Sequence, residues 1–319
     1  MLGFPVMPLI PLSDLQDARL DVYRDVKRQG VMRNGRYFIV EGVRTVERLL
    51  ASRFETESLL LAEERVSHWE GRLPPELPVY VLPTALASQL IGFHLHVGVM
   101  ACGLRQRTSS LEALLGLPEP PSSFGDGWRA AHRDSGSPRM PNANMRETGA
   151  AEDGSPRHPA GGIAVKALPE KMLLVVCPNC DNPENLGAII RIASAFRADG
   201  LLLGDACCDP FSRRVIRVSM GNIFQFAIRE SRDLAVDLNR LRQEFGFETM
   251  GTVLSEAALP LKTIRRPRRL ALLLGNEAEG LTQEWLDLCD QLVTIPMPPD
   301  VDSLNVAVAA GIFLHQFSE

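Results

Sequence analysis

Residues 172–317 alternate short apolar runs with stretches of helical periodicity, and this alternation constrains the fold more than any other feature. Met172–Val176 and Leu270–Leu274 are continuous apolar runs, which is the pattern of strands buried on both faces. Leu234–Phe245 carries its apolar residues at helical spacing instead. The alternation predicts an α/β fold with a parallel sheet and helices on both faces. Further strands are predicted at 200–204, 249–254 and 292–295, and further helices at 186–193, 213–224, 282–289 and 303–317.

A segment rich in Pro, Gly, Ser and charged residues divides the chain, which at 319 residues is long enough for two domains. We predict an N-terminal α/β domain over residues 1–108, a flexible linker over 109–168 and a C-terminal domain over 169–319. The N-terminal domain is expected to have strands at 36–40, 59–61, 79–81 and 97–101, and helices at 17–27 and 43–52.

Composition excludes few classes of protein. The net charge of −5 does not indicate nucleic acid, although an acidic protein can still carry a local basic surface. No apolar run is long enough to span a bilayer. Six cysteines in a chain of this size are typical of reduced thiols, so we predict a cytoplasmic protein.

Two short patterns resemble metal or redox motifs. Cys177 and Cys180 have the CxxC spacing, but no second pair accompanies them, and we predict no metal. His94 and His96 alternate as in a strand, so both rings should share one face, either structural or facing a substrate.

Three segments that follow predicted strands place polar residues beside glycines. In the first, Asn185 stands near a helix start, where it is expected to cap, and Arg191 shares a helical face with small residues. The small residues leave room for the guanidinium to reach a cavity. The simpler interpretation is a surface ion pair.

The second segment, Leu272–Leu281, has Gly275 and Gly280 around Glu277. Glycines allow a backbone to approach a ligand closely. The carboxyl end of a parallel strand is also the usual place for a site in α/β proteins. A plain turn with a solvated glutamate is the alternative.

The third segment, Ile295–Val306, ends in Ser303 and Asn305 within the first turn of the predicted last helix. Backbone N–H groups there have no helical partner and could bind a carboxylate or an adenine edge. Ordinary helix capping is the alternative.

Taken together and in this order, the three segments resemble the motifs of the SPOUT superfamily of RNA methyltransferases, in its TrmH/SpoU branch. The resemblance covers about residues 170–319. A weaker resemblance of residues 38–43 and 96–101 suggests the RNA substrate-binding domain that often precedes the catalytic domain in this branch. The family implies a trefoil-knotted parallel sheet, S-adenosylmethionine as methyl donor, a homodimer, and methylation of a ribose 2′-hydroxyl in rRNA or tRNA.

The resemblance also assigns roles by position. The expected catalytic residues are Asn185, Arg191, Glu277, Ser303 and Asn305. The expected donor-binding residues are Leu274, Gly275, Asn276, Gly280, Ile295, Met297, Leu304 and Asn305. Because a guanidinium stays protonated, we interpret Arg191 as an electrostatic clamp on the target phosphate and developing oxyanion, and not as the base.

Charge and helical periodicity predict contacts with RNA and with a second subunit. Basic residues expected to contact RNA are Arg36, Arg213, Arg214 and Arg217. A solvated basic surface is the alternative for each of them. The last helix is apolar on nearly every side, which predicts that a partner subunit covers part of it.

The sequence leaves two other functions to consider. A nicotinamide-dependent oxidoreductase is supported only by Gly125, Gly127 and Ala130, a GxGxxA pattern with no strand before it. A catalytically inactive RNA-binding protein of the same SPOUT fold is the remaining alternative to the enzyme.

Overall fold

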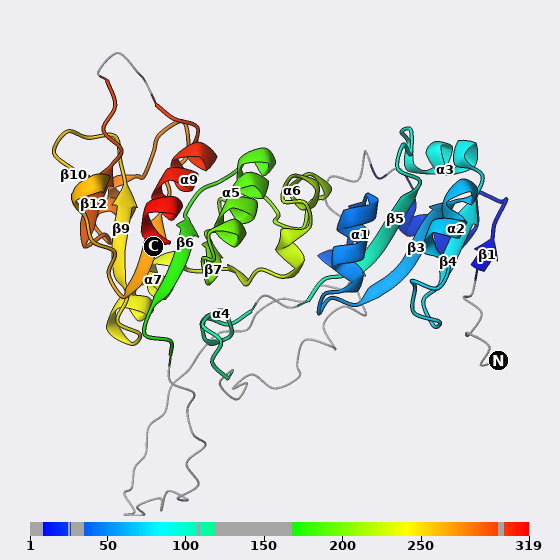
Figure 1. The fold of residues 1–319 in the computed structure, drawn as a ribbon, viewed down its shortest axis with the longest axis horizontal. Coiled ribbons are helices and arrows are strands. Elements are labelled where there is room, and N and C mark those ends of the chain that lie inside the picture. Colours follow the sequence, from blue (N-terminus) through cyan, green and yellow to red (C-terminus); the bar gives the residue numbers. More distant parts are fainter. Residues whose placement is uncertain are drawn as a thin grey trace, which may run out of the picture.

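The computed structural model describes residues 9–24, 26, 35–106, 109–118, 168–298 and 303–318. These residues form two α/β domains that lie side by side, each with its own sheet (Figure 1). The GxGxxA pattern at 125–130 lies outside the described residues.

The N-terminal domain is built on a mixed five-stranded sheet in the order β1-β4-β3-β5-β2. Strand β3 pairs in parallel with β4 and antiparallel with β5. The strands are β1 Leu9–Pro11, β2 Tyr37–Glu41, β3 Thr56–Ala62, β4 Val79–Leu82 and β5 Val99–Leu104. The helices are α1 Val43–Leu50, α2 Val66–Trp69 and α3 Thr84–Ile91, with short 3-10 helices η1 Ala18–Tyr23 and η3 Glu63–Arg65.

The helix predicted at 17–27 is wrong in type and length. Among the described residues of this range, only Ala18–Tyr23 is helical, and it is a 3-10 helix capped by Asp17. Leu20 and Tyr23 are both fully buried, and their spacing of three residues matches one 3-10 turn. The Tyr23 hydroxyl lies 2.9 Å from the Ser58 carbonyl oxygen and donates to it, so this turn is fixed to the sheet.

The C-terminal domain is built on a seven-stranded sheet in the order β10-β12-β9-β11-β6-β7-β8, and every neighbouring pair is parallel. The parallel sheet predicted from the alternation is confirmed. Its strands are β6 Met172–Cys177, β7 Gly200–Leu203, β8 Ile228–Glu230, β9 Glu248–Thr252, β10 Leu259–Pro260, β11 Arg269–Leu273 and β12 Gln291–Thr294. Its helices are α4 Leu111–Leu114, α5 Pro183–Ala195, α6 Arg213–Val218, α7 Leu234–Gln243, α8 Gln283–Leu286 and α9 Val306–Phe317, with 3-10 helices η5 Asn222–Phe224 and η6 Leu261–Thr263.

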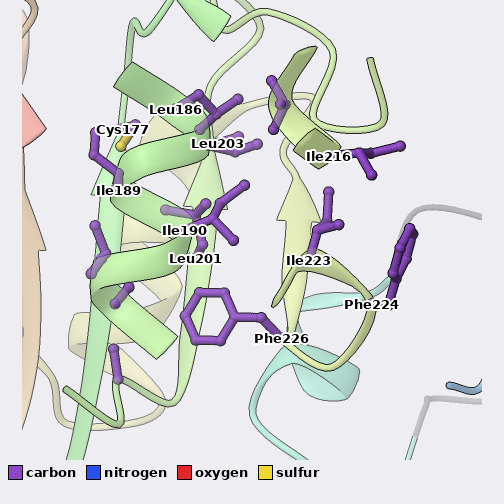
Figure 2. Close-up of a cluster of buried hydrophobic side chains, with 14 of the residues drawn as sticks. Cys177, Leu186, Ile189, Ile190, Leu201, Leu203, Ile216, Ile223, Phe224 and Phe226 are labelled. Atoms are coloured by element: carbon purple, nitrogen blue, oxygen red, sulfur yellow. The ribbon is translucent and has the colours of Figure 1, made fainter. Parts of the chain in front are cut away.

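Helices cover both faces of this sheet because successive strand residues point to opposite sides. Leu173 and Val175 of β6 pack in a cluster with residues of α5, α6 and α9. Leu174 and Val176 pack in a second cluster with residues of α4 and α7. Figure 2 shows part of the first cluster, where Ile190 of α5 points toward Leu201 of β7.

The start of the predicted linker belongs to the C-terminal domain. Leu111, Leu114 and Leu115 are buried in the second cluster, on α4 and the turn after it. Their spacing is helical, and Ser110 caps the turn by accepting from Ala113 N. Residues 119–167 of the predicted linker lie outside the described residues.

The helix predicted at 213–224 is interrupted. Helix α6 ends at Val218, and Met220 and Gly221 have positive φ angles of +56° and +77°. The break lies against α1 of the N-terminal domain. There Arg48 Nη1 donates to Met220 O at 2.6 Å and to Asn222 Oδ1 at 2.7 Å.

The two domains share an aromatic contact. The Phe38 ring of the N-terminal domain stacks on Phe224 with centroids 5.6 Å apart and packs on Phe211 at 5.3 Å. Arg105 forms ion pairs with Asp209 and Glu230 at the same contact. Because these aromatic rings and charged groups are all partly or fully buried, they fix how the N-terminal domain sits against the C-terminal one.

Helix α9 is apolar, as predicted, but only part of its surface is covered. Ala310, Phe313 and Leu314 are buried against the domain, whereas Val308 is 53% exposed and Ile312 is 39% exposed. Among the described residues, no helix combines the length and apolar character needed to cross a membrane.

Candidate active site

A cavity of about 520 Å³ opens at the carboxyl ends of β9, β11 and β12. Its walls come from the turn after β11, the segment after β12, the segment after β9, and the buried side of α9. The lining residues are Thr252–Ser255, Gly275–Leu281, Leu286, Leu292, Ile295, Met297, Ser303, Leu304, Val306, Ala309 and Phe313. Its volume is within the range of small-molecule and cofactor sites.

The turn after β11 has a fixed shape. Asn276 and Gly280 bond to each other through both backbone groups, at 3.2 and 3.1 Å. The Asn276 side chain closes the turn by accepting from Ala278 N at 3.0 Å and Glu279 N at 2.7 Å. Gly280 has a φ of +69°, and nothing lies within 4 Å of where its Cβ would be. Backbone therefore faces the cavity here without a side chain to obstruct it.

The segment before α9 reaches the cavity from the opposite side. Ser303 and Leu304 line it, and Ser303 is exposed. The sequence placed Ser303 in the first helical turn, but α9 begins only at Val306, and Asn305 is its cap. Asn305 Oδ1 accepts from Ala307 N at 2.9 Å and from Val308 N at 3.3 Å. Ser303 is thus a residue of the extended approach to the helix.

A side-chain bond joins the first and third segments. Asn305 Nδ2 donates to Asn185 Oδ1 at 2.9 Å. Asn185 is only 6% exposed, and within the described part of the chain its Nδ2 has no hydrogen-bond partner. Asn185 does not cap α5 as predicted; Asn182 does, by accepting from Glu184 N at 2.9 Å. A buried amide donor without a partner costs free energy unless a ligand or water satisfies it.

Arg191 is exposed on α5, and it does not line the cavity of its own chain. The small-residue face predicted around it is partly covered. A Cβ added to Gly187 would lie 2.7 Å from Val218 Cβ, so α6 packs tightly there. The next residue, Ile192, lies against Gly311 of α9 at 3.8 Å from the position of an added Cβ. Arg191 is thus on the outer surface of α5, the helix that packs against α9.

Most of the residues predicted to bind a donor lie in the cavity, with two exceptions. Leu274 is 1% exposed and belongs to the hydrophobic core. Asn305 acts next to the cavity, as the cap of α9. Sequence reasoning missed Thr252–Ser255, which form the wall beyond β9. The sequence held no signal for this wall, because Leu254 is recognisable only in the folded chain, where it is 61% exposed and lines the cavity.

The basic residues predicted to contact RNA have different surroundings. Arg36 is exposed, with its guanidinium 5.2 Å from the Tyr37 ring centroid. Arg213 is partly buried between domains, 3.5 Å from Glu41 and 4.4 Å from the Phe93 ring centroid. Arg214 pairs with Glu184 of α5, and Arg217 is exposed.

The thiols at the ends of β6 and β7 are close to one another. Cys208 N donates to Cys180 O at 2.9 Å, and Cys207 Sγ donates to Cys177 O at 3.1 Å. Burial raises the pKa of Cys207 to about 12 and that of Cys208 to about 11, so both remain protonated thiols at neutral pH. In the part of the chain that the structure describes, no group of three or more His, Cys, Asp or Glu side chains could hold a metal ion.

Gly275→Ala is expected to weaken ligand binding in the cavity more than tenfold. The added Cβ would lie 2.5 Å from the Gly280 carbonyl carbon and 2.7 Å from Leu281 N, and backbone atoms cannot move aside as a side chain can. Calorimetry with S-adenosylmethionine measures the effect. Gly280→Ala is the comparison in the same turn, because it meets no atom and adds only backbone strain of about 1–2 kcal/mol. If Gly275→Ala and the wild type bound S-adenosylmethionine equally, the turn would not be as rigid as we infer.

Comparisons with known proteins agree on one class. The model of the SpoU rRNA Methylase family matches residues 172–315. An uncharacterized tRNA/rRNA methyltransferase of Mycobacterium tuberculosis is 28% identical over 96% of this chain and 90% of its own length. The 23S rRNA (guanosine(2553)-2′-O)-methyltransferase RlmP of Bacillus subtilis is 32% identical over 48% of this chain and 62% of its own. The solved AdoMet-bound rRNA methyltransferase from Sinorhizobium meliloti has the same fold, with a TM-score of 0.70, 22% identity, and coverage of 97% of each chain.

The fold and cavity define a parallel α/β domain with a candidate ligand site at the carboxyl ends of its strands, preceded by a small α/β domain. Residues 172–315 match the model of the SpoU rRNA Methylase family, and the predicted relation to the SPOUT RNA methyltransferases is confirmed.

Proposed function

We propose that this chain transfers a methyl group from S-adenosylmethionine to a ribose 2′-hydroxyl of ribosomal or transfer RNA. The observation that carries the proposal is the meeting of three distant segments. Residues 275–281 line one cavity together with Ser303, Leu304 and Val306, and the bond between Asn305 and Asn185 ties the first segment to it. Relatives named for rRNA 2′-O-methylation support the same reaction.

The cavity suits the proposed donor. Leu254, Leu304 and Phe313 offer apolar walls for a flat base, and Glu277 and Ser303 are polar groups at the exposed edge. The carboxylates of Glu277 and Glu279 favour a ligand with cationic groups, which S-adenosylmethionine has in its sulfonium and its amine. When bound, this donor supplies an electrophilic methyl group.

Each polar residue of the site has a proposed role. Asn305 holds the start of α9 and orients Asn185, whose Nδ2 is buried without a hydrogen-bond partner among the described residues. Glu277 favours the positive charge of the donor. Arg191 stabilises the target phosphate and the negative charge that develops on the ribose oxygen, because its guanidinium is always charged and donates from a planar fork.

We propose a homodimer in which the exposed apolar side of α9 packs against a second copy. Val308 and Ile312 would be buried by that contact. Arg191 is exposed on α5, which packs against α9, and it lies outside the cavity of its own chain, so we place it at the cavity of the other copy. A trefoil knot in the C-terminal domain and a cytoplasmic location also remain proposals.

The N-terminal domain is the proposed RNA-binding domain, aided by the start of α6. Arg213 bridges the two domains through Glu41 and Phe93, and Arg214 and Arg217 follow it on the same helix. Aromatic rings and ion pairs hold the two domains against each other. RNA bound to the N-terminal domain would therefore lie at a fixed distance from the cavity.

Methyl transfer from radiolabelled S-adenosylmethionine to bulk RNA, taken from cells that lack this chain, tests the proposal. The expected product is a 2′-O-methylnucleoside, identified by mass spectrometry after nuclease digestion. A 2′-O-methyl group also makes the adjacent linkage resistant to alkali. A base-methylated nucleoside would contradict the ribose assignment. Donor binding without any transfer would favour the catalytically inactive RNA-binding protein.

A further inference from the structure

Two exposed imidazole rings lie against each other on the loop between α3 and β5. The centroids of His94 and His96 are 4.2 Å apart, with 37° between the ring planes. The sequence predicted that both rings share one face of a strand. The rings do lie together, but the backbone is a turn in which His96 N donates to His94 O at 3.0 Å.

The loop that carries the His94/His96 pair is held in place. Leu95, between the two histidines, is 2% exposed, and its N–H donates to Ser88 Oγ at 3.1 Å. Gly98 has a φ of +69°, and its carbonyl accepts from Ala62 N at 2.9 Å. The Arg65 side chain lies over Gly98, with its Cγ 2.5 Å from the position of an added Cβ. A fixed loop loses little conformational entropy when a ligand binds.

Contacts connect this pair to the candidate active site. The neighbouring Phe93 ring holds the Arg213 guanidinium at 4.4 Å, and Arg213 is the first residue of α6. Arg214 pairs with Glu184 in the first turn of α5, the helix that carries Asn185. In Figure 1, α6 lies between α5 and the N-terminal domain. A series of cation–π and ion-pair contacts thus runs from the loop to the helix of the site.

We propose that the His94/His96 pair is a stacking site for an unpaired base of the RNA, close to the nucleotide that is methylated. Flat exposed rings bind bases through their faces, and Arg217, exposed on α6, offers positive charge for the RNA backbone. Base-paired RNA keeps its base faces inside the helix, so the site selects single-stranded segments. The inference rests on the proposed function for its substrate class.

The test uses fluorescence anisotropy without donor, with a labelled oligoadenylate single strand and the same strand annealed to oligouridylate as probes. The wild type is expected to bind the single strand more tightly than the duplex. His94→Ala/His96→Ala is expected to weaken single-strand binding about tenfold, and His94→Phe/His96→Phe to stay within about twofold of wild type. His68→Ala is the matched control, because His68 is exposed on the same domain but packs on Trp69.

Three results would overturn the inference: no binding of the single strand by the wild type, equal affinities of the wild type and the alanine pair, or equal loss in the alanine and phenylalanine pairs. The last would mean that charge or hydrogen bonding, and not stacking, holds the RNA. Failure of methyl transfer is a separate result, since binding is measured without donor. In methylation assays the alanine pair should raise KM for RNA and leave kcat unchanged.

Discussion

Asn305→Ala is expected to reduce methyl transfer about 100-fold, the scale observed when one positioned donor is removed from a catalytic site. The substitution removes the cap of α9, where Oδ1 accepts from Ala307 N and Val308 N. It also removes the bond to Asn185. Loss of the cap alone should lower the free energy of unfolding by about 1 kcal/mol. Single-turnover methylation and urea denaturation measure the two effects.

Asn305→Asp separates the two roles. A carboxylate still caps the helix, and its charge favours the helix N-terminus, so the free energy of unfolding should stay close to wild type. It cannot donate to Asn185 Oδ1, so methyl transfer should fall nearly as far as in Asn305→Ala. Wild-type activity in Asn305→Asp would show that the bond between the two segments has no part in the reaction.

Val308→Glu/Ile312→Glu is expected to convert the proposed dimer into monomers and to abolish methyl transfer. Both side chains are exposed in one chain, although they are apolar. An uncompensated charge in an apolar interface costs about 3–5 kcal/mol, so the dissociation constant should rise by a factor of at least about 100. Light scattering over a range of protein concentrations measures the mass. Activity should be lost as well, because Arg191 does not line the cavity of its own chain.

Val236→Glu is the matched control for this prediction. Val236 is 51% exposed on α7. Helix α7 packs in the second cluster, on the face of the sheet opposite to α9. Substitution of Val236 should leave both mass and activity unchanged. A wild type that stays monomeric, or a monomeric double variant with full activity, would contradict the role of a second copy.

Much of the fold could be predicted because long buried strands have an unambiguous pattern. Met172–Cys177 and Arg269–Leu273 have apolar residues on both faces, which only a central strand requires. The three-residue strand Ile228–Glu230 was missed, since it is half-buried and too short to show a period. The 17–27 helix was wrong because a 3-10 turn and the start of an α-helix share the same apolar spacing over one turn.

The cavity could be predicted where glycine and polar residues follow a strand, as at Gly275–Gly280. The contribution of Thr252–Ser255 could not, because it depends on β9 lying between β11 and β12. Alternation of strands and helices does not determine strand order. The positions of Asn185 and Arg191 depend on how α5 packs between α6 and α9, and one chain's sequence pattern does not contain that packing.

A crystal structure of the protein with S-adenosylmethionine tests the central claim most directly. We expect the donor to occupy the cavity between residues 275–281 and 303–306, with Leu254 covered by it. A donor bound elsewhere, or no binding by calorimetry at concentrations that saturate other methyltransferases, would contradict the claim that these segments form one methyl-donor site.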